Sequence, residues 1–278
     1  MPTAVRAYPL LLLALLALSS GCTGRPAEST PAEDAARAER LRAEGLKQFR
    51  GQVANGTTSF DLIRTLADDE WMAVLKDQPI VSLSIVNRPV TDDGLANLAG
   101  NTALKELLMD GSKITDAGMK YLETMPNLEN VSLSAEITDA GLVHVKGLKN
   151  LKVINLSDKI TDAGLPHLVG LAELESVGPL STGVTGKGID TLAPLKNLSG
   201  INLFNSPIAD ADVDKLAQFP ELSHLTLSGT KITDAGLLKL AKLPKLQVLF
   251  ITNVAGITDQ GVQKLIEAKP SLKDGIVR

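Results

Sequence analysis

The stretch that decides the fold is Ile114-Thr115-Asp116-Ala117-Gly118-Met119, because close variants of it return throughout the chain. The other seven copies are residues 90–95, 137–142, 160–165, 184–189, 208–213, 232–237 and 257–262, and those at 184 and 208 are the weakest. Counted from start to start, the intervals between successive copies are 24, 23, 23, 24, 24, 24 and 25. A near-constant period over eight copies predicts a solenoid, in which each unit stacks on the next.

Each unit also contains a second short pattern, in which two apolar residues alternate after an earlier leucine. Alternation of this kind is typical of a short strand with one buried face. The copies are Leu104-x-x-Leu107-x-Met109, Leu128-x-x-Val131-x-Leu133, Leu151-x-x-Ile154-x-Leu156, Leu198-x-x-Ile201-x-Leu203, Leu222-x-x-Leu225-x-Leu227 and Leu246-x-x-Leu249-x-Ile251.

Together the two patterns resemble the leucine-rich repeat, over about residues 80–278. That stretch holds about eight repeats, each roughly 23–25 residues long, which lies within the range of this family. The repeated phrase looks like the cysteine-containing subclass, which is also found in F-box substrate receptors. This chain departs from that subclass, because Ser112, Ser206 or Thr230 stands where the subclass has its cysteine. The resemblance implies an α/β fold: a right-handed solenoid with a parallel concave sheet and short convex helices.

Within the phrase, each residue type suggests a local role. Thr115 and its equivalents stand where a helix begins, and their hydroxyl oxygens can accept hydrogen bonds from free N–H groups there. Asp116 would lie in the first turn, where the helix dipole favours negative charge. Gly118 would permit close packing between adjacent helices. Calcium binding is the alternative for the aspartate row, but one carboxylate per unit is too few for that ion.

The first 21 residues predict a signal peptide, with one basic residue, Arg6, before an apolar stretch from Leu10 to Leu18. The following Cys22 is the only cysteine, and its surroundings resemble the lipobox of bacterial lipoproteins. The leucine of that motif stands one place early here, because Ser19 is the third residue before the cysteine. We expect lipidation of Cys22, secretion across the inner membrane and a lipid anchor on the periplasmic or outer-membrane face of the envelope.

Between anchor and repeats, the composition changes twice. Residues 22–33 are small and polar with two prolines, so they predict a flexible tether behind the lipidated cysteine. Residues 34–79 predict a helical N-terminal region and a cap on the first repeat. The cap contains the only tryptophan, Trp71.

Composition excludes several classes of protein. Of the 278 residues, 46 are leucine and only 3% are aromatic, which fits a core built by repetition. A net charge of −4 argues against a nucleic-acid binder, and a single cysteine excludes a disulfide scaffold or a cysteine zinc cluster.

The sequence offers little enzyme chemistry. His144 and His167 occupy the same place in adjacent units, as Tyr121 does one unit earlier, and they predict a solvated ridge on the helical side. No carboxylate or cysteine in the pattern completes a metal site there, and no nucleophile elbow or phosphate loop occurs. We therefore expect no catalytic residue, no cofactor and no metal.

Binding is the function that the fold favours, through side chains between the strand leucines. Two columns are expected on the concave face: one from Ser84 to Phe250, and one reading Val86, Asp110, Ser134, Ser157, Leu180, Phe204, Ser228 and Thr252. Exposed aromatics among hydrogen-bonding residues are typical binding anchors. The candidate patch is Asn155, Asn202, Phe204, Asn205, His224 and Phe250.

Two irregularities bear on that face. Gly178-Pro179 stands where the fifth unit should place its last strand leucine, and proline removes a ladder donor, so we expect a local interruption of the sheet. The concave charges we can place are two lysines against five acidic residues, which disfavours phosphate backbones as ligands.

The sequence thus predicts a non-enzymatic lipoprotein of the bacterial cell envelope that binds a macromolecule, most simply a protein. One alternative is a substrate receptor of a ubiquitin ligase, which would need an F-box segment and a cytosolic location. An envelope enzyme of unrecognised type is the other alternative.

Overall fold

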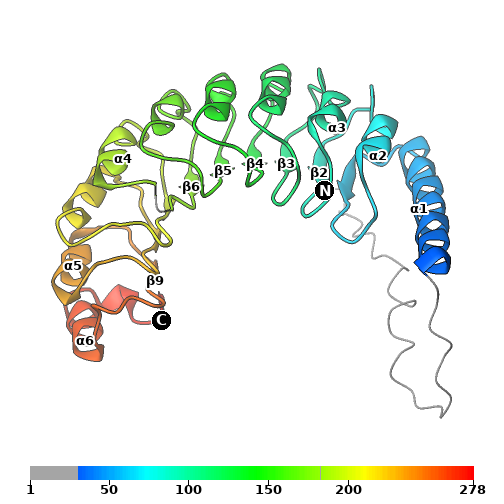
Figure 1. Ribbon diagram of the computed structural model, residues 1–278. Coiled ribbons are helices and arrows are strands. Elements are labelled where there is room, and N and C mark those ends of the chain that lie inside the picture. Colours follow the sequence, from blue (N-terminus) through cyan, green and yellow to red (C-terminus); the bar gives the residue numbers. More distant parts are fainter. Residues whose placement is uncertain (1–30, 182) are drawn as a thin grey trace, which may run out of the picture.

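The structure is a computed structural model, and it describes residues 31–181 and 183–278. The predicted signal peptide, the lipidation site Cys22 and most of the tether lie outside the described residues. The described chain forms an arch, with strands along its inner side and helices along its outer side (Figure 1).

All strands belong to one ten-stranded parallel sheet whose spatial order follows the sequence. The predicted α/β solenoid with a concave parallel sheet is therefore confirmed. The strands are β1 (Ser59–Asp61), β2 (Ser82–Ser84), β3 (Glu106–Leu108), β4 (Asn130–Ser132), β5 (Val153–Asn155), β6 (Ser176–Gly178), β7 (Gly200–Asn202), β8 (His224–Thr226), β9 (Val248–Phe250) and β10 (Ile276–Val277).

The convex side consists of short helices, one or two per unit (Figure 1). Their brevity follows from the short period, because every repeat must hold a strand, a helix and two turns. The α-helices are α1 (Pro31–Ala54), α2 (Asp69–Val74), α3 (Asp92–Ala96), α4 (Gly186–Thr191), α5 (Asp234–Lys239) and α6 (Asp259–Ala268). The 3-10 helices are η2 (Gly118–Thr124), η3 (Gly141–Val145), η4 (Leu165–His167), η5 (Val213–Gln218), η6 (Leu240–Lys242) and η7 (Pro270–Leu272).

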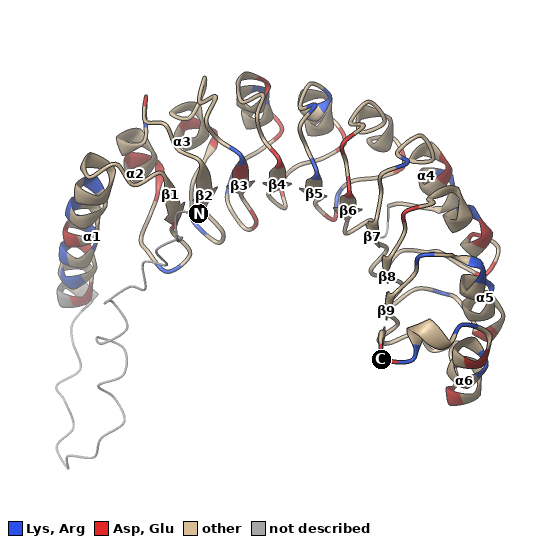
Figure 2. Ribbon diagram, turned by 180° about the vertical axis from the view of Figure 1, so that it is seen from behind, with Lys and Arg blue, Asp and Glu red and all other residues tan. Residues whose placement is uncertain are grey.

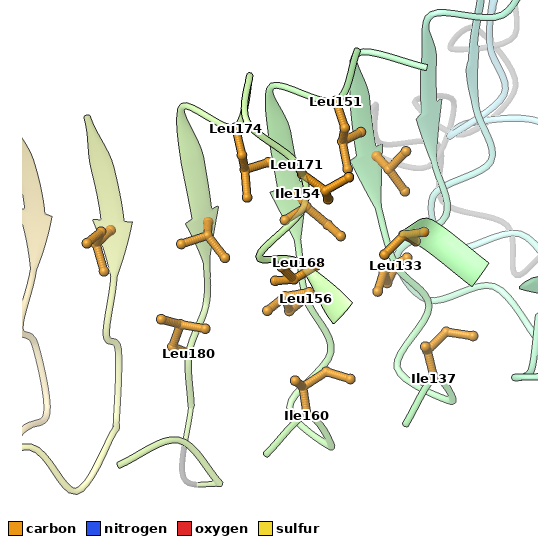
Figure 3. Close-up of a cluster of buried hydrophobic side chains, with 14 of the residues drawn as sticks. Leu133, Ile137, Leu151, Ile154, Leu156, Ile160, Leu168, Leu171, Leu174 and Leu180 are labelled. Atoms are coloured by element: carbon orange, nitrogen blue, oxygen red, sulfur yellow. The ribbon is translucent and has the colours of Figure 1, made fainter. Parts of the chain in front are cut away.

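The core is a continuous ladder between sheet and helices rather than a central cluster (Figure 3). In the unit around β5, Leu151, Ile154 and Leu156 meet Leu168 and Leu171, and all five are buried. A single unit cannot enclose these side chains by itself, so each unit depends on the apolar face of the next.

An aromatic cluster closes the N-terminal end. The ring of Phe49 in α1 lies 5.0 Å from that of Phe60 and 5.1 Å from that of Trp71, between ring centroids. Arg42 of α1 forms ion pairs with Asp68 at 2.5 Å and Glu70 at 2.7 Å. The α1 helix begins at Pro31, which is three residues before the start that the sequence predicted.

The repeat pattern starts one unit earlier than its obvious copies suggest. Strand β1 lies inside the region predicted as a cap, and Phe60 pairs in register with Leu83 of β2. The sequence carries a signal for this unit, because Phe60-x-Leu62 precedes Leu83-x-Ile85 by 23 residues.

The fifth unit shortens the strand pairing without interrupting the sheet, which continues through it. Strand β6 pairs with β7 at only two positions, Ser176 with Gly200 and Val177 with Ile201, whereas its neighbours pair at three. Gly178-Pro179 adds one residue between the two buried strand positions. Leu180 therefore takes the second of them and is only 1% exposed, which corrects its predicted place on the concave surface.

Candidate binding surface on the concave sheet

The structure brings most of the predicted patch together over strands β7–β9. Asn202 of β7 lies beside Thr226 of β8, which lies beside Phe250 of β9. His224 lies in the neighbouring column, between Gly200 and Val248. These positions form one surface because parallel strands in register place equivalent side chains about 4.8 Å apart.

Asn155 is farther from this group than the sequence suggested. It is exposed on β5, and Gly178 of β6 is its in-register neighbour. With one intervening strand, about two strand spacings, or ~10 Å, separate it from the column position of Asn202.

Phe204 and Phe250 are the large exposed groups of this surface, with exposed fractions of 44% and 38%. Val277 of β10 pairs in register with Phe250 and is also 44% exposed. Sequence reasoning left Thr226 and Val277 out of the patch. Strand register alone would have added both, since each occupies the column that contains Asn202 and Phe250.

Asn205 has a second, structural reason for its position. Its φ of 56° is left-handed, and its N–H donates to the Ser228 carbonyl at 2.9 Å. Asn87 and Gly111 hold the equivalent turn in earlier units, also with positive φ. Asn205 is therefore exposed at the rim of the patch, and turn geometry explains the choice of residue.

The second predicted column is only partly exposed. Phe204 and Thr252 face solvent, whereas Ser134, Ser157 and Ser228 are buried, with exposed fractions of 0%, 5% and 4%. Ser134 and Ser157 belong to units that are one residue shorter, and the Ser134 hydroxyl donates to the Ser112 carbonyl at 2.9 Å. Ser228 is buried in a unit of ordinary length, so a fixed offset from the strand does not by itself decide which side chains are exposed.

Most charged side chains on the N-terminal half of the concave face are paired within the protein. Glu129 accepts hydrogen bonds from Lys105 at 2.8 Å and Lys152 at 2.9 Å. These two lysines lower the pKa of Glu129 to about 2. Three other acidic groups accept hydrogen bonds from neighbouring serine hydroxyls: Ser82 donates to Glu106 at 2.6 Å, Ser181 to Asp158 at 2.7 Å, and Ser132 to Asp110.

Charge is absent from the surface of β7–β9. Residues 199–206, 223–230 and 247–254 contain no Asp, Glu, Lys or Arg. Figure 2 shows the contrast, with tan strands β7–β9 and a charged β3 in the same arch. The two halves of one concave face thus differ in chemistry.

One polar pair on this surface resembles part of a catalytic site. The Ser223 hydroxyl lies 2.9 Å from Nδ1 of His224. A nucleophile of this kind needs a third group that orients the imidazole, commonly a carboxylate. No carboxylate occurs in the three stretches that make up this surface, so the pair supplies hydrogen-bonding groups rather than a triad.

The aspartates of the repeated phrase tie adjacent units together. Asp116 accepts from the N–H of Thr138 at 2.8 Å and from its hydroxyl at 2.6 Å. The same two bonds recur at six other junctions, from Asp69, Asp92, Asp139, Asp162, Asp210 and Asp234. The predicted role beside the helix dipole therefore misses the main partner, which belongs to the next unit.

These hydrogen bonds also change the pKa of the aspartate carboxyl group. The backbone N–H and the hydroxyl of Thr258 hold the pKa of Asp234 below its ordinary value. The predicted threonine cap is confirmed where the unit forms an α-helix: Thr233 caps α5 and accepts from the N–H of Ala235 at 3.2 Å, and Thr258 caps α6 and accepts from the N–H of Gly261 at 3.0 Å. Thr138 precedes a 3-10 helix, η3, whose first turn has no side-chain cap.

The histidine ridge has one partner that the sequence did not reveal. Nδ1 of His144 lies 2.7 Å from a carboxylate oxygen of Glu123. Over residues 31–181 and 183–278, no three His, Cys, Asp or Glu side chains gather closely enough to hold a metal ion. No helix in this same part of the chain is long and apolar enough to cross a membrane.

Comparison with known proteins bears on the fold alone. No protein-family model and no curated protein sequence matches this chain. Among solved structures, it is similar to an internalin C2 from Listeria monocytogenes, with a TM-score of 0.59 and 23% identity over 76% of this chain and 92% of that one. This similarity supports the leucine-rich-repeat architecture.

Two weaker similarities were found. A second Listeria monocytogenes internalin has a TM-score of 0.38 and 15% identity over 83% of this chain and 92% of that one. The Rad7 and Elc1 complex of yeast has a TM-score of 0.48 and 16% identity over 75% of this chain and 63% of that one.

Proposed function

We propose that this leucine-rich-repeat chain binds a protein partner through the concave surface of β7–β9, without catalysing a reaction. The observation that carries the proposal is the pair of exposed phenylalanines, Phe204 and Phe250, on a rigid sheet. Three of the six exposed large apolar side chains in the described residues, these two and Val277, gather on this part of the sheet.

The physical argument is that an aromatic side chain left in water on a rigid scaffold loses little entropy when a partner covers it. Binding energy at protein interfaces concentrates in a few such aromatic anchors, whose truncation commonly costs about 2 kcal/mol or more. Thr226 and Thr252 add hydroxyls that have no hydrogen-bond partner within the described residues. A partner can therefore gain both apolar and polar contacts here.

The test is capture of partners from a cell-envelope extract with the full chain as bait. The Phe204→Ala, Phe250→Ala double variant should lose at least tenfold in recovered partner, which is the expected loss for two anchors. The matched control is Leu238→Ala on convex helix α5, since Leu238 is as exposed as Phe204 at 44%. Equal loss in the control, or no loss in the double variant, would contradict the proposal.

We also propose that Cys22 is lipidated and holds the solenoid at a membrane of the bacterial envelope, after export directed by residues 1–21. Nine peptide steps separate Cys22 from Pro31, the first residue of α1. At most about 3.5 Å per residue, the anchor lies within about 30 Å of the helix. The solenoid would then work close to the membrane surface.

Metabolic labelling with a fatty acid tests the anchor. The wild-type chain should incorporate label and fractionate with membranes, and Cys22→Ser should do neither. Cys22 is the only cysteine, so no second thiol can accept the label. Equal labelling of both proteins would overturn this part of the proposal and leave the binding surface untouched.

A further inference from the structure

The concave face is divided into a charged half and an uncharged half, and the division falls at the fifth unit. From β2 to β6, charged side chains are common: Lys105, Glu106, Asp110, Glu129, Lys152, Asp158 and Glu175. From residue 199 to 206, and at the equivalent places of the next two units, there are none.

In the charged half, most charged side chains already have partners within the protein, so few are free to bind a ligand. Glu129 lies between Lys105 and Lys152, so these three charges satisfy one another. Glu106 and Asp158 each accept a hydroxyl of the adjacent unit, from Ser82 and Ser181. A ligand that bound here would have to break these bonds before it gained its own.

The uncharged half offers the opposite. Thr226 lies between Asn202 and Phe250, and its hydroxyl has no partner within the described residues; Phe204 follows Asn202 by two residues. His224 is exposed one column away. These groups can cover apolar side chains and exchange hydrogen bonds with backbone amides, but they cannot neutralise a buried charge.

From this division we propose that the partner presents an uncharged, apolar, extended polypeptide segment to β7–β9. Placing a charged side chain on this surface would remove it from water without an opposite charge to compensate, which is costly. Two strand spacings of about 4.8 Å give a path of about 10 Å across β7–β9, and about three extended residues span that length. The inference rests on the proposed binding function and names the chemistry of its partner.

A consequence for solution conditions follows. Affinity between charged surfaces falls as salt rises, because ions screen the attraction over about 10 Å at 0.1 M. Contacts made by Phe204, Phe250 and uncharged polar groups involve no attraction between charges that salt could screen. Binding should therefore change less than twofold between 50 and 500 mM NaCl.

The experiment uses the chain from Cys22 onward, expressed without residues 1–21 so that its single thiol stays unlipidated and can be coupled to a support, and a random ten-residue peptide library as the probe. Selection is carried out at 50 and at 500 mM NaCl. The enriched peptides should contain a run of at least three residues free of Asp, Glu, Lys and Arg, with at least one large apolar side chain. The same run should be enriched at both salt concentrations.

Two variants assign the binding to one half of the face. Phe204→Ala with Phe250→Ala should lower peptide recovery at least tenfold, whereas Lys105→Ala with Lys152→Ala should leave it unchanged. Enriched peptides that are rich in charge, are lost at 500 mM NaCl and depend on the two lysines would overturn the inference while leaving protein binding intact. A selection without enrichment would also overturn it, and capture from the envelope extract would then decide the proposed function separately.

Discussion

At the scale of single residues, the repeated phrase encodes a contact between units rather than a feature of one helix. Asp210 accepts from the N–H of Thr233 at 2.7 Å and from its hydroxyl at 2.6 Å. A Cβ atom on Gly236 would lie 2.2 Å from the same carboxylate. Aspartate, threonine and glycine thus form one three-part joint, in which glycine is needed because the carboxylate occupies the space of a side chain.

This joint predicts a strong dependence between two substitutions. Gly236→Ala alone should lower the free energy of unfolding by about 1–3 kcal/mol, because its methyl group collides with Asp210. Asp210→Ala alone should cost about 1–2 kcal/mol through the lost hydrogen bonds. In the Asp210→Ala background, Gly236→Ala should cost less than ~0.5 kcal/mol, since all three nearest atoms belong to residue 210. Urea unfolding of the four proteins measures the cycle, and additive costs would refute the joint.

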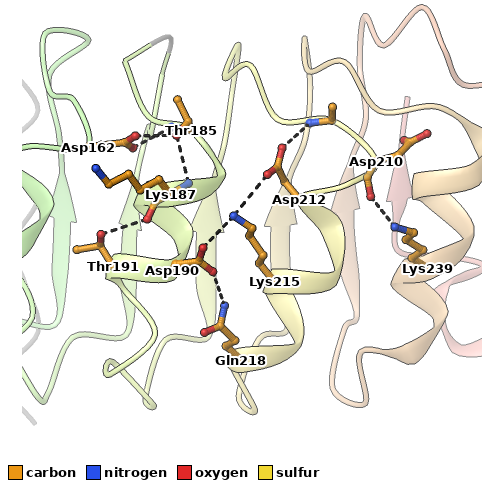
Figure 4. A network of polar contacts seen from close by, with 11 residues as sticks. Asp162, Thr185, Lys187, Asp190, Thr191, Asp210, Asp212, Lys215, Gln218 and Lys239 are labelled. Atoms are coloured by element: carbon orange, nitrogen blue, oxygen red, sulfur yellow. Dashed lines mark hydrogen bonds and ion pairs between the residues drawn. The ribbon is translucent and has the colours of Figure 1, made fainter.

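At the scale of elements, the joint between α4 and η5 is built the other way round. Gly186 stands in the aspartate position of its unit, and Asp212 stands in the glycine position of the next (Figure 4). A Cβ atom on Gly186 would lie 1.8 Å from Asp212 Oδ1. The two residues have exchanged places, so one carboxylate still faces one residue without a side chain.

The exchange has a structural cost. Asp212 accepts from the N–H of Ala209, which belongs to its own unit, at 3.2 Å. The link between units that Asp162 makes to Thr185 one junction earlier is therefore missing at this one. An exposed ion pair from Lys215 to Asp190 at 2.8 Å crosses the junction, but exposed pairs contribute little to stability.

Restoring the usual joint should repair this junction. Gly186→Asp alone should destabilise the fold by about 1–3 kcal/mol, because the new side chain meets Asp212. Combining it with Ala209→Thr and Asp212→Gly rebuilds the joint seen elsewhere, and this triple variant should be at least as stable as the wild-type chain. Urea midpoints compare the three proteins. A triple variant no more stable than Gly186→Asp would show that the exchange is not compensatory.

At the scale of the whole molecule, two irregularities coincide. Strand pairing between β6 and β7 is one position shorter than at the neighbouring junctions, although the Leu180 N–H still donates to the Asn202 carbonyl at 2.7 Å, and the carboxylate link between units is missing at the same junction. Repeat proteins hold together through contacts between nearest neighbours, so a weak junction divides the stack into blocks of separate stability. The division also separates the charged half of the concave face from the uncharged half.

We therefore predict that the solenoid loses hydrogen-exchange protection in two blocks, residues 59–178 and residues 200–278. Exchange measured by mass spectrometry over a urea series should place the boundary between β6 and β7. The triple variant above should bring the two transitions closer together. A single transition that covers both blocks in the wild-type chain would contradict the prediction.

Much of this could be predicted from the sequence because its information is periodic. Eight copies of one phrase established the solenoid, the strand leucines identified the buried face, and Phe204 and Phe250 could be placed on the concave side by counting. The prediction went wrong where counting failed. Ser134, Ser157 and Ser228 are buried at an offset from the strand at which Phe204 and Thr252 are exposed, and Leu180 is buried because the fifth unit carries an extra residue in its strand.

What the sequence determined by itself is the architecture, since a short, near-constant period with fixed apolar positions permits stacking in only one way. Only the tertiary structure decided which side chains remain free to bind a partner. The partner of Asp116 lies 22 residues away in the next unit, and Glu129 satisfies two lysines from two different strands. Such pairings depend on distances between units, which a linear pattern does not contain. For that reason the uncharged surface of β7–β9 became distinct only when its charged neighbours were seen to be occupied.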